Sequence, residues 1–293
     1  MSMDHKDIAV LEADFDSPYC RVDLDIEYAH RDGVRLCLHV IRPVVNDDST
    51  KFPLIVFSQG SSWMKQDMGK EIVQLSSFAK RGYVIALAEY RSAEVRGFPA
   101  QVLDTRSAVS FLYNNAELYN IDKDNIILWG TSSGAHTVLM CAVTQNLPEF
   151  SYEDIKNEKL SFRAVIDYYG PTDITKLVPE EDGYKYVGQE SPISYLIGNV
   201  NLWHSPKVTD KMIPMNYIDK YHVKTPMFIL HGTNDSMVHH SQSIDLYECL
   251  VKNNVPAEIY LVDNADHGGG CFWTEAILDR IEKFISKHIV IDK

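Results

Sequence analysis

Three residues of this sequence have the types that nucleophilic attack on a carbonyl carbon requires. Ser132 lies in the run GTSSG at 130–134, while Asp235 and His267 each come shortly after an apolar run typical of a buried strand. A serine hydroxyl is a weak nucleophile at neutral pH, so it needs a histidine to accept its proton and a carboxylate to orient that histidine. We therefore predict that Ser132, Asp235 and His267 form one catalytic group.

The residues around Ser132 predict a sharp turn between a strand and a helix. NIILW at 125–129 is apolar, and the chain from Ala135 onward continues without Pro or Gly for about three turns. An exposed nucleophile on such a turn needs small neighbours, because strand and helix must approach closely. The pattern Gly-x-Ser-x-Gly alone carries little information, since it arises by composition in roughly one chain in ten of this length. The flanking strand and helix therefore support Ser132 more than the pattern does.

Other acidic residues compete for the role given to Asp235. Asp263 and Asp266 lie close to His267 in sequence, and Asp173 follows another predicted strand, in YGPTD. Asp266 adjoins His267, and its carboxylate would have difficulty reaching the ring. Asp235 is preferred because its position after a separate strand fits the order serine, acid, histidine.

The remaining histidines and the cysteines predict no metal site and no disulfide framework. His136 lies one turn beyond Ser132 and is expected to pack in the interior, and the pair His239-His240 is expected to begin a helix. The five cysteines are scattered and odd in number. We expect neither a metal ion nor a cofactor.

A developing oxyanion needs preorganised N–H donors. One is expected from the backbone of Ser133, directly after the nucleophile. The other is expected from the loop in VFSQGSSWMKQD at 56–67, where small residues let the backbone approach a substrate. Ser61 is the preferred donor and Gly60 the alternative, with Trp63 as an aromatic wall beside them.

The order of the predicted elements favours an α/β fold: a mostly parallel, twisted sheet with helices on both faces and an N-terminal antiparallel hairpin over 22–43. The right-handed crossovers of such a fold bring the carboxyl ends of the parallel strands to one rim. The predicted strands are 52–58, 83–90, 125–129, 162–170, 226–232 and 257–264. The predicted helices are 72–82, 98–116, the segment from 135 onward, 241–254 and 274–289.

The segment 170–221 interrupts this alternation with several prolines and many aromatic residues. Loops of this length usually have a function or elements of their own. We predict a cap insertion over the site, within a single domain spanning 1–293. Its aromatics could stack on sugar or phenolic rings or could only pack the cap. The predicted substrate-binding residues are Trp63, Tyr195 and Trp203, and further candidates are Tyr184, Tyr186 and Tyr217.

Composition and charge exclude several partners. The chain has 293 residues and a formal net charge of −13, which disfavours nucleic acid and anionic membrane surfaces. The acidic start has no apolar core of a secretory signal, and no apolar run approaches the length of a membrane span. We expect a cytoplasmic protein whose partner is a small molecule. The oligomeric state is left open, and a homo-oligomer is compatible with the sequence.

The chain resembles the α/β-hydrolase superfamily, specifically the esterase/lipase group related to hormone-sensitive lipase and to bacterial feruloyl and acetyl-xylan esterases. The resemblance covers about 52–288 and rests on EYRSAEVRGFPAQVLD, YGPTD, ESPISYLIG, HGTNDSMV and NADHG. It implies an α/β-hydrolase fold with Ser132 as nucleophile, Asp235 as acid and His267 as base. The usual His-Gly-Gly-x-Trp oxyanion loop reads QGSSW here, which leaves open which loop N–H serves.

The resemblance implies a serine carboxylesterase that hydrolyses small carboxylic esters through an acyl-enzyme, with acetyl or feruloyl esters of carbohydrates favoured. A peptidase of the prolyl-oligopeptidase type is one alternative, disfavoured because few residues precede the hydrolase pattern. A non-catalytic binding module on a hydrolase scaffold is another, since fold does not imply function. A binding module has no need for all three members of the triad.

Overall fold

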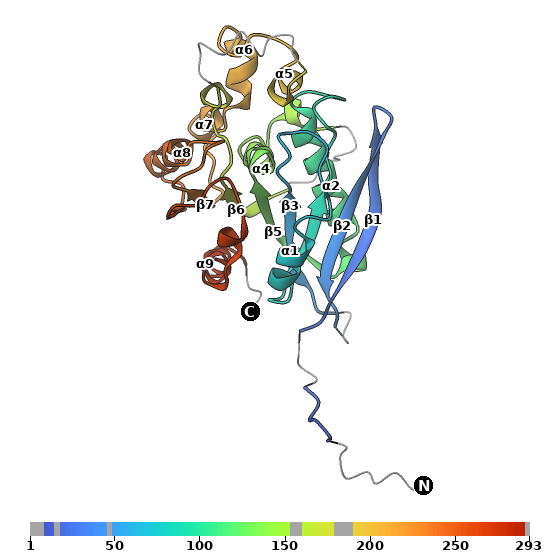
Figure 1. Cartoon of the computed structure of the whole chain (residues 1–293). Helices are drawn as coiled ribbons and strands as arrows, with labels where there is room; N and C mark the ends of the chain where they lie inside the picture. Colours follow the sequence, from blue (N-terminus) through green and yellow to red (C-terminus); the bar gives the residue numbers. More distant parts are fainter. Residues whose placement is uncertain (1–8, 15–17, 46–48, 153–159, 179–189, 291–293) are drawn as a thin grey trace, which may run out of the picture.

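The computed structural model describes residues 9–14, 18–45, 49–152, 160–178 and 190–290. Within these ranges eight strands form one sheet in the order β1-β2-β4-β3-β5-β6-β7-β8 (Figure 1). The strands are β1 Cys20–Arg31, β2 Val34–Pro43, β3 Phe52–Ser58, β4 Val84–Ala88, β5 Ile121–Thr131, β6 Phe162–Tyr168, β7 Met227–Gly232 and β8 Ala257–Val262.

The sheet is parallel except at one edge. β1 and β2 form an antiparallel hairpin whose turn residues, Asp32 and Gly33, have φ of +48° and +76°, and β2 also pairs antiparallel with β4. Such positive φ values are typical of the tight turns that match the twist of a hairpin. All pairs from β4 onward across the sheet are parallel. The predicted hairpin and mostly parallel sheet are confirmed.

Helices cover both faces of the sheet, as the alternation predicted. Apolar side chains of α2, α4 and α8 form one core with one face, and those of α1 and α9 form a second core with the other. Figure 1 shows α1 and α9 together on one side of the strands. The helices are α1 Ile72–Ala79, α2 Ala100–Asn114, α3 Ala116–Tyr119, α4 Ser133–Val143, α5 Pro192–Leu196, α6 Pro206–Thr209, α7 Met215–Ile218, α8 Ser241–Lys252 and α9 Glu275–Ser286.

The described parts of the segment 170–221, which are 170–178 and 190–221, contain short elements instead of a sheet strand. Pro192 and Pro206 begin α5 and α6, where their missing N–H groups need no partner. Apolar residues of the segment, including Leu196 and Met212, pack with Trp63 in a third cluster. The 3₁₀ turns of the described chain are η2 Pro148–Phe150, η3 Ile174–Lys176, η5 Asp210–Met212 and η6 Gly270–Trp273. Tyr184 and Tyr186 lie outside the described residues.

The topology brings three loops to one rim of the sheet. β5, β7 and β8 are parallel strands, so their carboxyl ends meet at this rim. Ser132 directly follows β5, Asp235 follows β7, and His267 follows β8. Elsewhere, the helices of the described ranges are too short or too polar to cross a lipid bilayer.

Candidate active site

Ser132 sits on a strained turn between β5 and α4. Its φ is +50° and its ψ is −125°, a conformation that non-glycine residues rarely adopt. Its N–H donates to the carbonyl of Tyr168 on β6, at 2.8 Å, which holds the turn against the sheet. A Cβ atom at Gly134 would lie 2.0 Å from the carbonyl oxygen of Ser58. Glycine at this position therefore lets α4 approach the end of β3.

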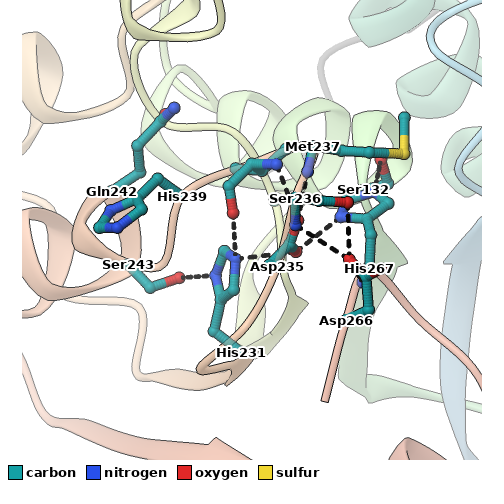
Figure 2. A network of polar contacts seen from close by, with 12 residues as sticks. Ser132, His231, Asp235, Ser236, Met237, His239, Gln242, Ser243, Asp266 and His267 are labelled. Carbon is teal, nitrogen blue, oxygen red and sulfur yellow. Dashed lines mark hydrogen bonds and ion pairs between the residues drawn. The ribbon is translucent and has the colours of Figure 1, made fainter. Parts of the chain in front are cut away.

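Ser132, His267 and Asp235 form one hydrogen-bonded chain (Figure 2). The Oγ of Ser132 lies 2.8 Å from Nε2 of His267, and Nδ1 of His267 lies 2.7 Å from Oδ2 of Asp235. A carboxylate oxygen only accepts, so Nδ1 carries the proton. Nε2 of the neutral ring is then left to accept from the Ser132 hydroxyl. The structure brings the three predicted residues together in the tautomer that a general base needs.

The carboxylate of Asp235 has its acceptor sites filled. Oδ1 accepts from the N–H groups of Met237 and Val238 at 2.9 and 2.8 Å, and Oδ2 lies 2.7 Å from His267 and 3.1 Å from His231. Burial by itself would raise the pKa of Asp235. The hydrogen bonds from His231, His267 and Val238 outweigh that effect and hold the pKa well below its usual range. Asp235 is therefore a charged partner for His267 at neutral pH.

The other candidates for the acid of the triad form hydrogen bonds with groups other than the imidazole of His267. Oδ1 of Asp266 accepts from the N–H and hydroxyl of Ser236 and from the N–H of His267, so it ties two loops together without reaching the imidazole ring. Asp173 caps η3 by accepting from the N–H of Thr175. Asp263 accepts from its neighbour Asn264.

The loop after β3 lies against the turn that carries Ser132. Its N–H groups at Ser61 and Gly60, the preferred and the alternative candidate for the second oxyanion donor, already donate to side-chain oxygens: Gly60 to Thr131 Oγ1 and Ser61 to Ser133 Oγ, each at 2.9 Å. The hydroxyl of Tyr90 lies 3.0 Å from Ser61 Oγ and completes a buried clamp on the loop. Either predicted donor would have to break such a bond before it could bind an oxyanion.

One backbone N–H in the loop after β3 and one at the start of α4 lie beside Ser132 without a hydrogen-bond partner in the described part of the chain. Among the described residues, the N–H of Ser62 and the N–H of Ser133 have no hydrogen-bond partner. Ser62 and Trp63 both have positive φ, +54° and +59°, so the chain turns sharply after Ser61. This turn presents Ser62 at the edge of both cavities described next.

Two cavities meet at Ser132. Ser62, Ser132, Met237 and His267 line both of them. The first, of about 320 Å³, is polar and is also lined by Lys70, Glu71, Gln74, Tyr169, Trp273 and the glycines at 268–270. The second, of about 230 Å³, is largely apolar and is also lined by Trp63, Pro171, Leu177, Val178, Pro192 and Ile193.

The three predicted substrate-binding residues differ in whether they line a cavity beside Ser132. Trp63 lines the apolar cavity, and its indole N–H donates to Nδ1 of His136 at 3.2 Å. His136 is an interior residue as predicted, and burial lowers its pKa to about 4. Tyr195 and Trp203 pack, partly buried, against the third cluster and line neither cavity. Their predicted contact with substrate has no support from these two cavities.

Sequence reasoning missed the aliphatic wall and one aromatic neighbour of His267. Leu177 and Ile193 lie in the irregular segment, where an aliphatic residue gives no signal of facing a cavity. The ring of Tyr169 lies 4.8 Å from that of His267, edge to face, and Tyr169 also lines the polar cavity. Within the described ranges, no three His, Cys, Asp or Glu side chains gather as metal ligands would.

Comparison with known proteins identifies the family. The family model BD-FAE matches residues 41–250, well over half of the chain. The chain belongs to the BD-FAE family. Ser132 and Asp235 lie within the matched range of this BD-FAE protein, whereas His267 lies beyond its end.

Two curated relatives are esterases by name. The chain is 24% identical over 203 residues to esterase LipC of Mycobacterium tuberculosis, covering 68% of this chain and 48% of LipC. It is 22% identical over 259 residues to a probable isoprenylcysteine alpha-carbonyl methylesterase, ICMEL1, of Oryza sativa subsp. japonica, covering 86% of this chain and 58% of that protein. The chain thus spans about half the length of the curated relatives it matches.

Solved structures establish the fold. A truncated carbohydrate esterase from gut microbiota superposes with a TM-score of 0.76 at 23% identity, over 94% of this chain and 98% of that one. The butyrate-bound esterase Est2 of Thermogutta terrifontis superposes with a TM-score of 0.72 at 21% identity, over 93% and 96% of the two chains. This BD-FAE protein has the α/β-hydrolase fold, as the resemblance implied.

Proposed function

We propose that this protein is a serine carboxylesterase that hydrolyses small carboxylic esters through an acyl-enzyme on Ser132. The observation that carries the proposal is the hydrogen-bonded chain from the Ser132 hydroxyl through His267 to Asp235, on the rim of an α/β-hydrolase sheet. The esterase names of its relatives agree with this chemistry. No step requires a cofactor.

In the first half-reaction, Oγ of Ser132 attacks the ester carbonyl carbon while its proton passes to Nε2 of His267. The resulting imidazolium is stabilised by the Asp235 carboxylate, whose depressed pKa keeps it charged. The tetrahedral intermediate then expels the alcohol, which takes the proton from His267 as it leaves. A water molecule repeats the sequence on the acyl-enzyme and releases the carboxylic acid.

The oxyanion needs two N–H donors, and we assign them to Ser133 and the loop after β3. For the loop we favour Ser62 over Ser61 and Gly60, because the N–H groups of Ser61 and Gly60 each donate to a side-chain oxygen. A preorganised donor must be free to meet the developing charge. The clamp made by Ser61, Ser133 and Tyr90 then serves to hold Ser62 in place.

The two cavities support different subsites for the two halves of an ester. The leaving alcohol must take a proton from His267, and the polar cavity includes the glycine-rich loop that follows His267. Its polar lining, with Lys70 and Gln74, suits a hydroxylated alcohol such as a sugar. The apolar cavity, of about 230 Å³, suits the acyl group. Acyl esters of carbohydrates are therefore the favoured substrates, with small acetyl esters first and larger, aromatic feruloyl esters second.

A substrate panel tests this function. p-Nitrophenyl esters of graded chain length, acetylated xylan and methyl ferulate are compared with an acyl-peptide p-nitroanilide, all in the presence of EDTA. We expect hydrolysis of short acyl esters, with kcat reduced roughly 10³- to 10⁶-fold in Ser132→Ala. Absence of ester hydrolysis, or a clear preference for the anilide, would contradict the proposal.

A further inference from the structure

A second histidine binds the carboxylate that binds His267. His231 lies near the end of β7 and is fully buried. Its Nε2 lies 3.1 Å from Oδ2 of Asp235, the same oxygen that faces Nδ1 of His267 (Figure 2). We propose that His231 is a positioning residue, which fixes this carboxylate oxygen in the direction that His267 needs. The inference rests on the proposed role of Asp235 as the acid of the triad.

The surroundings of His231 determine its tautomer. Nε2 lies 2.8 Å from the carbonyl oxygen of Val238 as well as close to Asp235. Both neighbours are acceptors, so Nε2 must carry a hydrogen. On the other side of the ring, Nδ1 lies 2.7 Å from the hydroxyl oxygen of Ser243, a fully buried residue in the first turn of α8. In the neutral ring, Nδ1 accepts from this hydroxyl, and Ser243 thereby keeps the hydrogen on Nε2, where the N–H faces both the carbonyl of Val238 and Oδ2 of Asp235.

In this arrangement both carboxylate oxygens of Asp235 have hydrogen-bonding neighbours besides His267. Two backbone N–H groups fix Oδ1, whereas only side chains reach Oδ2. Without His231, the position of Oδ2 would depend on His267 alone, and His267 must shift its charge during each half-reaction. The donor from His231 is independent of that change. The carboxylate can then keep its orientation while the imidazole of His267 is protonated and deprotonated.

A purely structural role for His231 is the rival explanation. Its charged and titratable neighbours are Asp235 in the loop after β7, Asp167 on β6 and His240 beside α8. A residue that only fills this interior would affect folding stability and leave the titration of the catalytic group unchanged. A positioning residue changes both the turnover rate and the acid limb of the pH profile.

Three variants separate these explanations. His231→Leu removes the donor and keeps an apolar side chain, His231→Gln keeps an amide N–H near the place of Nε2, and Ser243→Ala removes the hydroxyl that directs the tautomer. We expect His231→Leu to lower kcat roughly ten- to a hundredfold, with KM changed by less than about threefold. His231→Gln should recover most of the loss, and Ser243→Ala should fall between the wild type and His231→Leu.

The pH profile gives the second readout. When Asp235 loses one donor, its carboxylate attracts protonated His267 more strongly, so a higher pH is needed to produce the neutral base. The acid limb of kcat/KM should therefore move to higher pH in His231→Leu and in Ser243→Ala, and return in His231→Gln. If His231→Leu does not fold, the other two variants still give this comparison.

A lower melting temperature with unchanged kcat and an unchanged acid limb would overturn the inference. Equal impairment of His231→Gln and His231→Leu would overturn it as well. If the proposed function itself is wrong, the wild-type protein will not hydrolyse esters, and that result refutes the role of the triad. An active wild type with unaffected His231 variants refutes only the positioning role.

Discussion

The carboxylate of Asp235 shows why residue type alone does not single out the acid that we propose for the triad. Asp235, Asp266 and Asp173 all lie on the same rim, and each accepts several hydrogen bonds. Only Asp235 reaches the imidazole of His267, and its second oxygen is tied to two backbone N–H groups. Chain order predicted this choice, whereas the second histidine at Oδ2 could not be foreseen. HGTND gives no sign that His231 turns toward Asp235.

Replacement of Asp235 tests its assigned role directly. Asp235→Asn should lower kcat by about 10⁴-fold, because an amide can donate to Nδ1 and then stabilises the wrong tautomer of His267. Asp173→Asn and Asp266→Asn are matched controls on the same rim and should cost less than about tenfold. Steady-state kinetics on a short-chain p-nitrophenyl ester gives the three values. A larger loss in either control than in Asp235→Asn would reassign the acid.

Among the elements, strands and long helices were predictable because each buries a regular pattern. Continuous apolar runs, typical of strands covered on both faces, occur at 52–57 in β3, 126–129 in β5 and 227–230 in β7, and β6 carries Arg163 and Asp167 among its apolar residues. The short helices α5, α6 and α7 have no such pattern, because each spans about one turn and its position depends on tertiary packing. The predicted substrate-binding residues Tyr195 and Trp203 show where prediction from the sequence reaches its limit. Aromatic content indicated that the segment packs, but did not indicate which side chains face the cavity.

The role proposed for the loop after β3 can be tested by substitution. Ser133→Ala keeps the backbone N–H of residue 133 but removes the acceptor of the Ser61 N–H. If Ser62 is the oxyanion donor and the clamp positions it, kcat should fall about three- to tenfold, the worth of one neutral hydrogen bond. Tyr90→Phe should change kcat in the same direction by less. A rise in kcat in Ser133→Ala would show that Ser61 was the donor, released from a competing bond.

The irregular segment between β6 and β7 allows a matched comparison of two side chains. Ile193 lines the apolar cavity and Trp203 packs outside it. Ile193→Ala should shift the ratio of kcat/KM for hexanoyl over acetyl esters by about tenfold, since one methylene in an apolar pocket is worth roughly 1–3 kcal/mol. Trp203→Ala should instead lower the free energy of unfolding by roughly 1–3 kcal/mol and leave the substrate ranking unchanged. A changed ranking in Trp203→Ala alone would restore its predicted role in substrate binding.

At the scale of the whole molecule, one buried acid makes stability depend on pH. Asp167 is fully buried under the active-site rim, and burial raises its pKa from 3.8 to about 7, despite a hydrogen bond from the N–H of Gly170. Between these two values the folded chain retains a proton that the unfolded chain has lost. The free energy of unfolding therefore falls as pH rises from about 4 to about 7, by roughly 4 kcal/mol at most.

Asp167→Asn should remove this dependence, because an amide can still accept from Gly170 and does not ionise. Melting temperatures measured at pH 5 and pH 8 give the comparison. The decrease between the two pH values should be larger for the wild type than for Asp167→Asn. Equal decreases in both proteins would mean that Asp167 does not titrate in this range.

The account as a whole depends on Ser132 being the nucleophile, and covalent labelling measures this most directly. After reaction with a fluorophosphonate, peptide mass spectrometry should place the adduct on Ser132 and on neither Ser61 nor Ser133. Ser132→Ala should retain the melting behaviour of the folded protein and form no adduct. An adduct on another serine of the wild type, or labelling that persists in Ser132→Ala, would contradict the central claim.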